Sequence, residues 1–371
     1  MKCMTDLERI LPLWREVEAA GADYVLATIV AVEGPSYRKP GACMLLTPDG
    51  RRAGTVSGGC LEAQVARRVW WLTENGPRVE RYSTAEEDGE RPYGSGCGGV
   101  VFLLLERRET AGPLLAALER ACMRRTALAV ATVLDGENVG RRAFAGLEER
   151  RGEGDSLQEL AEVALAGGKS MEKRIAVEGT EVRVWANFQP ARPGLWIFGA
   201  GDDAQPLGRM AKELGWFVAV ADGRSHLATR ARFPLADEVR VLQIGELPGE
   251  QAAVLGSFHA RDAAVLMTHS FDQDARILAS LLAMDAPPAY IGVLGTQRRT
   301  REVLVEVARL LSLPEVPAEQ WLAQLHSPMG LDLGADSPET IGLCVVAEIQ
   351  KSLVAATGLP LREVRGAASS R

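Results

Sequence analysis

The stretch LWIFGAGDDA at residues 195–204 decides the fold of the second half of the chain. Its four leading apolar residues predict a short buried strand, and Gly199 and Gly201 predict a tight turn that opens a helix at Ala204. This order is the G-x-G-x-x-A form of the dinucleotide-binding fingerprint. Asp222 follows Gly201 by 21 residues and ends the next apolar run, where a ribose-binding carboxylate belongs. The stretch therefore predicts a Rossmann-like α/β unit.

Strand-like and helix-like patterns alternate on both sides of Asp222. We expect strands at 195–198, 217–221, 263–267 and 290–294, and helices at 204–214, 272–284, 297–311 and 338–356. Ser337 as a cap and Pro338 in the first turn favour a helix start there. Such alternation is typical of a parallel, doubly wound sheet. The stretch QPARPG at 189–194 predicts a linker, so we expect domains at 1–190 and 191–371.

The first half has a different pattern, which predicts a mixed α+β domain. Its expected elements are a β-rich run at 24–32, a hairpin turn at Asp49-Gly50, a helix at 61–73, a strand at 100–105, a helix at 113–123, a strand at 127–134, and a loop with one helix over 145–173. The fold class expected for the whole chain is α/β, with this domain preceding the Rossmann-like sheet.

Composition narrows the class of protein. A length of 371 residues suggests two domains. The net charge of −7 argues against a general nucleic-acid binder. No apolar run is long enough for a membrane span, and the N-terminus lacks a signal-peptide pattern, so we expect a cytoplasmic protein that does not enter membranes. The six cysteines include no C-x-x-C pair, which argues against a disulfide framework or a structural zinc site.

Three features of the second half are candidates for ligand binding. Gly199 and Gly201 could bind the pyrophosphate of NAD(P) or FAD, or they could serve only to make the turn. His269 ends a predicted strand, where it is either a ligand contact or a hydrogen-bonded structural residue. Gly295 precedes two arginines, 298 and 299, that form either a second anion cradle or a solvated helix face. All three are expected at one edge of the sheet.

Two glycine-flanked cysteines mark the first half. The segment SGGCLE at 57–62 stands between a predicted strand and helix, and a thiolate near a helix N-terminus is stabilised. The segment GSGCGG at 94–99 precedes a predicted strand, and its glycines suit close backbone approach by a ligand. A mobile loop with an incidental cysteine is the alternative. The candidate cofactor-binding residues here are Gly58, Gly59, Cys60, Cys97, Gly98 and Gly99.

Taken together, these segments resemble the XdhC/CoxI family of accessory proteins of xanthine dehydrogenase and related molybdenum hydroxylases. The resemblance covers nearly the whole chain through GPSYRKPGA at 34–42, GTVSGGCLE at 54–62, GCGG at 96–99, FGAG at 198–201, MTH at 267–269, YIGVLG at 290–295 and HSPMGLDLGA at 326–335. The SGGC and HSPMGL segments are the most specific. Many members carry histidine after the Gly-Ala-Gly, where this chain has Asp202.

The resemblance implies an XdhC/CoxI N-terminal domain followed by a Rossmann domain. It implies a chaperone, not an enzyme, that binds molybdenum cofactor (molybdopterin), protects it, and assists its insertion in sulfurated form into an apo molybdenum hydroxylase. A cysteine desulfurase and a second copy of the chain are the other implied partners. The alternatives are an NAD(P)- or FAD-dependent oxidoreductase that uses the Rossmann site, and a scaffold in which that site is vestigial.

Overall fold

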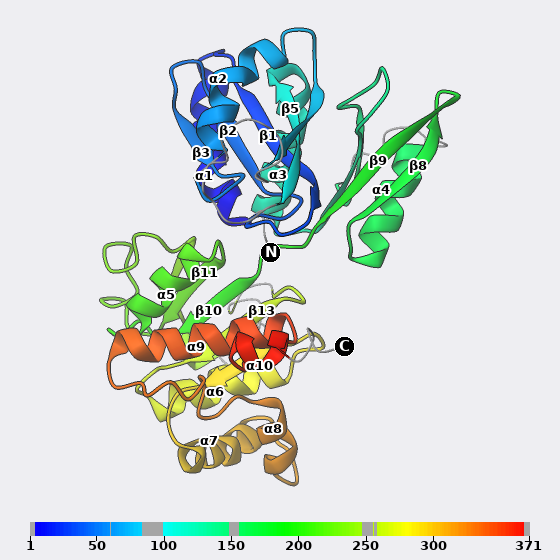
Figure 1. The fold of residues 1–371 in the computed structure, drawn as a ribbon. Helices are drawn as coiled ribbons and strands as arrows, with labels where there is room; N and C mark the ends of the chain where they lie inside the picture. The colour runs from blue at the N-terminus through cyan, green and yellow to red at the C-terminus, as the bar shows by residue number, and fades with distance from the viewer. Residues whose placement is uncertain are drawn as a thin grey trace. The chain divides into compact units, whose positions relative to one another are not determined.

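The computed structural model describes residues 4–59, 61–83, 99–147, 156–246, 255 and 258–366 (Figure 1). The chain divides into two compact units, Met1–Arg192 and Pro193–Arg371. The division lies in the short connection between strand β9 (Thr180–Gln189) and strand β10 (Gly194–Phe198), the first strand of the second unit. Each unit has hydrophobic clusters of its own. None of the described helices is both long and apolar enough to span a membrane.

The first unit contains an antiparallel five-stranded sheet in the order β3-β2-β1-β5-β4. These strands are β1 (Val25–Glu33), β2 (Cys43–Leu46), β3 (Arg52–Gly54), β4 (Arg78–Ser83) and β5 (Val100–Arg107). The side chains of β1 alternate between two cores. Val25 and Ala27 pack with helix α2 (Glu62–Leu72), whereas Leu26 packs with the helices on the other face. Burial on both faces explains why β1 is a continuous apolar run.

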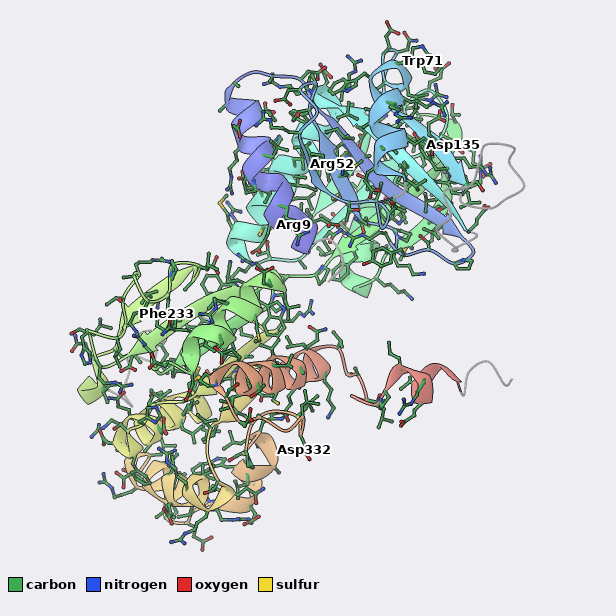
Figure 2. All side chains as sticks on the ribbon, turned by 60° about the vertical axis from the view of Figure 1, so that its left-hand side comes forward. Arg9, Arg52, Trp71, Asp135, Phe233 and Asp332 are labelled. Carbon is green, nitrogen blue, oxygen red and sulfur yellow. The ribbon has the colours of Figure 1, made fainter. Side chains whose placement is uncertain are left out.

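Further helices and a second sheet complete the described part of the first unit. Helices α1 (Met4–Ala19) and α3 (Arg108–Arg124) cover the face opposite α2. The second sheet is antiparallel and four-stranded, in the order β7-β6-β9-β8, and helix α4 packs on it. Besides β9, the strands of this second sheet are β6 (Leu128–Val133), β7 (Arg142–Ala145) and β8 (Met171–Val177), and the helix packed on it is α4 (Ser156–Gly167). Trp71 projects from α2 and is 68% exposed (Figure 2).

The second unit is a parallel five-stranded sheet in the order β12-β11-β10-β13-β14. Its other strands are β11 (Phe217–Asp222), β12 (Glu238–Val241), β13 (Asp262–Leu266) and β14 (Tyr290–Val293). The chain runs outward from β10 to β12 and then returns to β13 on the other side of β10. This reversal creates a switch point at the carboxyl ends of β10 and β13, which is where α/β sheets bind ligands.

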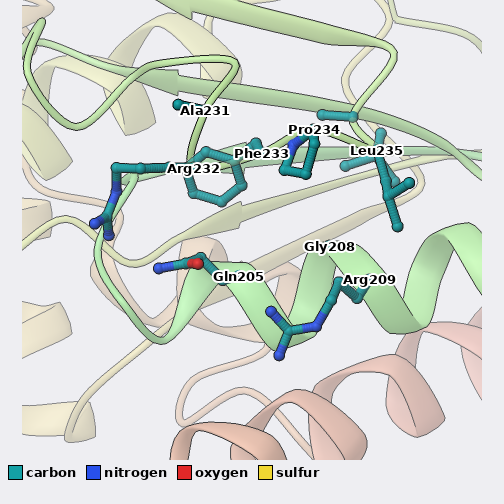
Figure 3. Close-up of a pocket in the computed structure, with 10 residues that line it drawn as sticks. Gln205, Gly208, Arg209, Ala231, Arg232, Phe233, Pro234 and Leu235 are labelled. Carbon is teal, nitrogen blue, oxygen red and sulfur yellow. The ribbon is translucent and has the colours of Figure 1, made fainter.

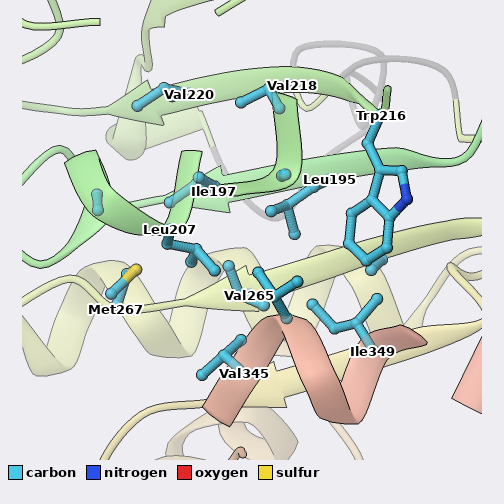
Figure 4. Close-up of a cluster of buried hydrophobic side chains, with 14 of the residues drawn as sticks. Leu195, Ile197, Leu207, Trp216, Val218, Val220, Val265, Met267, Val345 and Ile349 are labelled. Carbon is cyan, nitrogen blue, oxygen red and sulfur yellow. The ribbon is translucent and has the colours of Figure 1, made fainter. Parts of the chain in front are cut away.

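Helices cover both faces of the parallel sheet. Helices α5 (Ala204–Glu213) and α9 (Pro338–Leu353) bury one face, where Leu207 and Val345 meet Ile197 and Val265 (Figure 4). Helices α6 (Phe271–Leu282) and α7 (Gln297–Leu310) bury the other. Ser337 caps α9 in a capping box with Thr340. The remaining elements are a 3-10 turn (Ile244–Glu246), α8 (Ala318–Gln324) and α10 (Leu361–Gly366).

The expected α/β class and the strands and helices expected from residue 195 onward are confirmed within one to three residues at their ends. Several elements were not predicted, namely α1, β4, β7, β9, β12, α8 and α10. The expectation for 145–173 was incomplete, because β8 begins at Met171 after helix α4. The first unit holds two separate sheets, which had not been foreseen.

Candidate functional site

The glycine-rich turn follows β10 at the switch point of the parallel sheet. Gly199 has φ of +119°, and a Cβ atom there would lie 2.6 Å from the Met267 carbonyl oxygen. Its N–H donates to the carbonyl of Ala221 at 2.8 Å. Only glycine fits both the dihedral angle and the close approach to the neighbouring strand. Gly199 is therefore required by the packing of the turn itself.

Asp222 lies at the end of β11, as predicted, but its carboxylate already has protein partners. Oδ2 accepts from the Ala200 N–H at 2.7 Å and from Nη2 of Arg224 at 2.7 Å. Oδ1 accepts from the N–H of Arg224 at 2.8 Å and from its Nε at 3.0 Å. Burial alone would raise the pKa of Asp222, but these donors outweigh it and the pKa is lowered. The acid braces the turn with a full set of hydrogen bonds.

His269 lies beside the glycine-rich turn. A Cβ atom on Gly201 would be 3.6 Å from His269 Nε2, so the two residues are neighbours across the switch point. The Thr268 hydroxyl accepts from the Ser270 N–H at 3.2 Å and lies 3.0 Å from the Ser270 carbonyl oxygen. These contacts fix the backbone on both sides of His269. His269 is itself exposed. Gly201 and His269 therefore lie close together at the carboxyl ends of neighbouring parallel strands, as expected.

The two arginines after Gly295 have different partners. Arg299 forms an ion pair with Asp274 at 2.7 Å, and Asp274 also accepts from the Thr268 hydroxyl at 2.6 Å. The Asp274 side chain is 1% exposed, and its burial raises its pKa despite these contacts. Arg298 is 89% exposed and pairs with Glu302 along its own helix. Gly295 has φ of +109°. Arg298 thus lies on a solvated helix face, and Arg299 ties α7 to α6.

In the first unit, Glu62 organises the glycine-rich segment between β3 and α2. Its Oε1 accepts from the backbone N–H groups of Val56 and Ser57 at 3.1 and 2.8 Å. The hydroxyls of Thr55 and Ser57 also donate to its carboxylate. Burial would raise the pKa of Glu62, but these donors outweigh it and the pKa is lowered. The buried carboxylate therefore fixes the turn that presents Gly58 and Gly59, which are exposed.

Described residues of three motifs, Gly99, Gly58 and the loop between β1 and β2, meet at one end of the five-stranded sheet. A Cβ atom on Gly99 would lie 1.9 Å from the Pro35 carbonyl oxygen, which forbids any larger residue without a backbone shift. A Cβ atom on Gly58 would be 4.0 Å from Cδ1 of Tyr37, in ordinary contact. Tyr37 is 74% exposed. The loop between β1 and β2 therefore joins the segment before β5 to the segment before α2.

The structure describes only some of the cysteines. Cys60, Cys97 and Gly98 lie outside the described residues, and their roles stay predictions. Cys43 is 3% exposed in the core beside α1, and Cys122 is partly buried against the same core. Among the residues that the structure describes, no group of three or more His, Cys, Asp or Glu side chains could hold a metal ion.

A further polar cluster in the second unit went unassigned in the sequence. Glu348 on α9 accepts from the Tyr290 hydroxyl at 2.7 Å and from the Gly330 N–H at 2.6 Å, and it lies 3.0 Å from Nδ1 of His326. The His326 ring stacks on Tyr290 with centroids 4.1 Å apart. These contacts hold the HSPMG segment against β14. The motif was visible in the sequence, but its partner Glu348 was not.

Comparison with known proteins agrees with this architecture. Residues 195–349 match the XdhC Rossmann domain, and residues 17–83 match the XdhC and CoxI family. A crystal structure of a xanthine dehydrogenase from Bacillus halodurans has a TM-score of 0.71 and 29% identity, with 94% of this chain and 96% of that chain covered. The fold of the two units is therefore shared with a solved protein.

Two relatives match nearly the whole length of the chain. One is a probable xanthine dehydrogenase subunit of Bacillus subtilis (strain 168), which is 33% identical over 88% of this chain and 92% of its own length. The molybdenum cofactor insertion chaperone PaoD of Escherichia coli (strain K12) is 26% identical over 93% and 89%. The resemblance drawn from the motifs is thereby confirmed, and the chain belongs to the XdhC and CoxI family.

Proposed function

We propose that this chain binds molybdenum cofactor as cargo and assists its insertion, in sulfurated form, into a xanthine dehydrogenase-type molybdenum hydroxylase. The observation that carries the proposal is that Gly99 and Gly58, each from a glycine-rich motif, both lie against the 34–42 motif at one end of the first sheet, Gly99 at Pro35 and Gly58 at Tyr37. Two relatives support it, one named as part of a xanthine dehydrogenase and the other as a molybdenum cofactor insertion chaperone.

The chemistry of the cargo suits this end of the sheet. Molybdenum cofactor is an anionic pterin dithiolene that carries a phosphate. Exposed Gly58 and Gly59 let such a group approach the backbone, and they stand just before the N-terminus of α2, which favours negative charge. Cys60 and Cys97, adjacent in sequence to these glycine segments, would supply the soft thiolates that suit molybdenum–sulfur chemistry. Glu62 keeps the turn in one shape for binding.

Taken by itself, the second unit offers a separate candidate binding site at its switch point. We propose that the backbone of Gly199 and Gly201, the exposed side chain of His269 and Gly295 at the neighbouring strand end form this site. Asp222 would act by bracing the turn, because its oxygens already accept four protein hydrogen bonds. A ribose hydroxyl would have to displace those donors, which is why we favour cofactor delivery over NAD(P)- or FAD-dependent redox catalysis.

A protein that delivers a cofactor acts through its partners and does not itself catalyse a reaction. In this proposal an apo molybdenum hydroxylase receives the cofactor, a cysteine desulfurase supplies the sulfur, and the chain acts in the cytoplasm as a homodimer. The cysteines and glycine-rich segments would hold the cargo until the apoenzyme takes it.

The test is anaerobic purification of the chain after co-expression with the cofactor biosynthetic enzymes. Bound pterin is measured by fluorescence after oxidation, and molybdenum by mass spectrometry. We expect pterin to co-purify with the chain and to activate an apo-hydroxylase on mixing. The Cys60→Ala, Cys97→Ala double variant should lose pterin but keep its circular dichroism spectrum. Cys122→Ala, a partly buried thiol on α3, is the matched control and should retain pterin.

Two results would contradict the proposal. One is a folded wild-type chain that carries no pterin but co-purifies with NAD(P) or FAD, which would move the assignment to a redox enzyme. The other is a double cysteine variant that retains and delivers pterin as well as the wild type, which would remove the thiols from the site.

A further inference from the structure

The second unit contains a pocket on the flank of helix α5, and none of the residues assigned above lines it. It lies between the first turns of α5 and the chain segment 231–236 that precedes β12 (Figure 3). Its volume is about 220 Å³. That volume lies below the ~300–1,000 Å³ typical of sites for drug-sized ligands. The pocket therefore has room for a small organic molecule.

The walls of the pocket are mostly apolar. Val218 of β11 and Phe233 lie at its inner side and are 1% and 5% exposed, so these surfaces are fixed by the core. Pro234 and Leu235 form part of the wall opposite α5 (Figure 3). Leu235 is 54% exposed. An apolar body in the pocket would cover it and gain from the burial of both surfaces.

Cationic and amide side chains also line the pocket, with the Gln205 amide between the two guanidinium groups (Figure 3). Gln205 and Arg209 project from α5, and Arg232 reaches in from the opposite segment (Figure 3). The Arg209 guanidinium forms no ion pair or hydrogen bond with any residue that the structure describes. Nε of Arg232 is buried and has no hydrogen-bond partner in the described part of the chain. Two guanidinium groups thus have unused donors beside an apolar wall.

We propose that this pocket binds a small organic carboxylate whose body is apolar and compact. Guanidinium groups recognise carboxylates through paired, charge-assisted hydrogen bonds, and the exposed Arg209 guanidinium has no partner among the described residues that would compete for them. The apolar walls of Phe233 and Leu235 take the rest of the molecule. Binding needs both a carboxylate for the guanidinium groups and an apolar body for the walls. An inorganic anion lacks the apolar body, and a neutral molecule of the same shape lacks the charge.

Ligand in this pocket would also act on the glycine-rich turn. Nη2 of Arg232 donates to the carboxylate of Asp202 at 2.7 Å and to the Ala200 carbonyl at 3.3 Å. The Asp202 side chain is 84% exposed, so its ion pair with Arg232 is a weak competitor for the guanidinium. A carboxylate bound to Arg232 would loosen that link. The inferred site is therefore linked to the turn after β10 through the hydrogen bonds of Arg232, and it does not depend on the cargo proposed above.

The test is titration of the full chain, methyl-labelled at leucine and valine, with benzoate and with cyclohexanecarboxylate. We expect binding with a dissociation constant of about 1 mM, as befits a small fragment. The methyl signals of Val218 and Leu235 should shift, whereas those of Leu343, an exposed side chain on α9, should not. Benzamide, the neutral analogue, and inorganic phosphate should each bind about tenfold more weakly than benzoate.

Variants distinguish the pocket from general anion binding. Arg209→Gln and Arg232→Gln should each weaken benzoate binding about tenfold, because each removes a charge-assisted donor. Arg209 is exposed on α5, so its replacement leaves the fold intact even if Arg232→Gln disturbs the 231–236 segment. Arg298→Gln on α7 is the control and should change nothing. Lack of binding by both carboxylates, or equal binding by both arginine variants and the wild type, would overturn the inference.

Discussion

The Asp222 carboxylate lies 2.7 Å from the backbone nitrogen of Ala200, across the glycine-rich turn that separates β10 from α5. The other donors to this carboxylate come from Arg224, two residues farther along the chain. An acid in the position typical of ribose recognition thus serves the turn's own structure. The same sequence fingerprint can therefore encode a braced loop as readily as a dinucleotide site.

Asp222→Asn should destabilise the second unit. The asparagine amide would place N–H groups where Ala200 and Arg224 now donate, leaving donors unpaired in a site that is 0% exposed. We expect the free energy of unfolding to fall by about 2–4 kcal/mol. Urea unfolding monitored by tryptophan fluorescence measures it. Asp202→Asn, on the same turn but exposed, is the control and should change stability by less than about 1 kcal/mol.

The effect of Asp222→Asn should depend on pH. The folded-state pKa of Asp222 is below its ordinary value of 3.8, so the ionised form stabilises the folded state. That stabilisation is complete above pH 3.8 and is lost as the pH falls through the folded-state pKa. The difference in unfolding free energy between wild type and variant should be constant near neutrality and shrink below pH 3.8. A difference that stays constant into strong acid would contradict this assignment.

Glu62→Gln should loosen the turn that presents Gly58 and Gly59. The glutamine amide would face a hydroxyl that now donates to Glu62, and it would weaken the bonds that fix Val56 and Ser57. We expect a loss of about 1–3 kcal/mol in the free energy of unfolding. Pterin retention should fall with it. Glu74→Gln, an exposed site just beyond α2, should leave both quantities unchanged.

Gly99→Ala and Gly58→Ala form a matched pair. At Gly99 the added methyl group would overlap the Pro35 carbonyl, so the loop after β1 must move, and we expect a loss of at least about 2 kcal/mol. At Gly58 the methyl group meets only Tyr37 at 4.0 Å, and the fold should tolerate it. Thermal unfolding separates the two. If Gly58→Ala folds normally but loses pterin, close backbone approach by the cargo is supported; unchanged retention would count against it.

Glu348→Gln should release the HSPMG segment from β14. The carboxylate accepts from Tyr290 and Gly330, and both contacts weaken when it becomes a neutral amide. The pKa of Glu348 is lowered, because these donors and His326 outweigh its burial, so the ionised form is the stabilising one. We expect faster amide hydrogen exchange at His326 and Val293 by about tenfold. Glu302→Gln on the surface of α7 should leave exchange there unchanged.

Most of the second unit could be predicted from the sequence because its central strands are buried on both faces and appear as uninterrupted apolar runs. The strand β12 was missed for the opposite reason. It is a sheet edge of four residues, EVRV, with two charges and partial exposure throughout. In the first unit, β8 (MEKRIAV) is also an edge strand rich in charge, and it gave no apolar run.

Some contacts of the candidate site residues could also be predicted from the sequence, and others could not. The proximity of Gly201 and His269 was predictable, because parallel strands end at a common edge. The bracing of Ala200 by Asp222 was not, because spacing alone does not say which donors a side chain will meet. Glu62 stood in a recognised motif, yet its role depends on side-chain directions in a turn. Glu348 lies 22 residues from His326, a distance that no local pattern spans.

The segment around His326 also has a consequence for how the parallel sheet ends. His326 pairs with Gly292 as a short parallel bridge, donating to the Ile291 carbonyl and accepting from the Val293 N–H, each at 2.9 Å. These outward-facing groups of β14 are thereby paired within the chain, and less of this border is open to a strand from another polypeptide. If two copies of this chain associate by continuing a sheet in this unit, we expect them to do so along β12, because the bridge at His326 obstructs β-addition at β14.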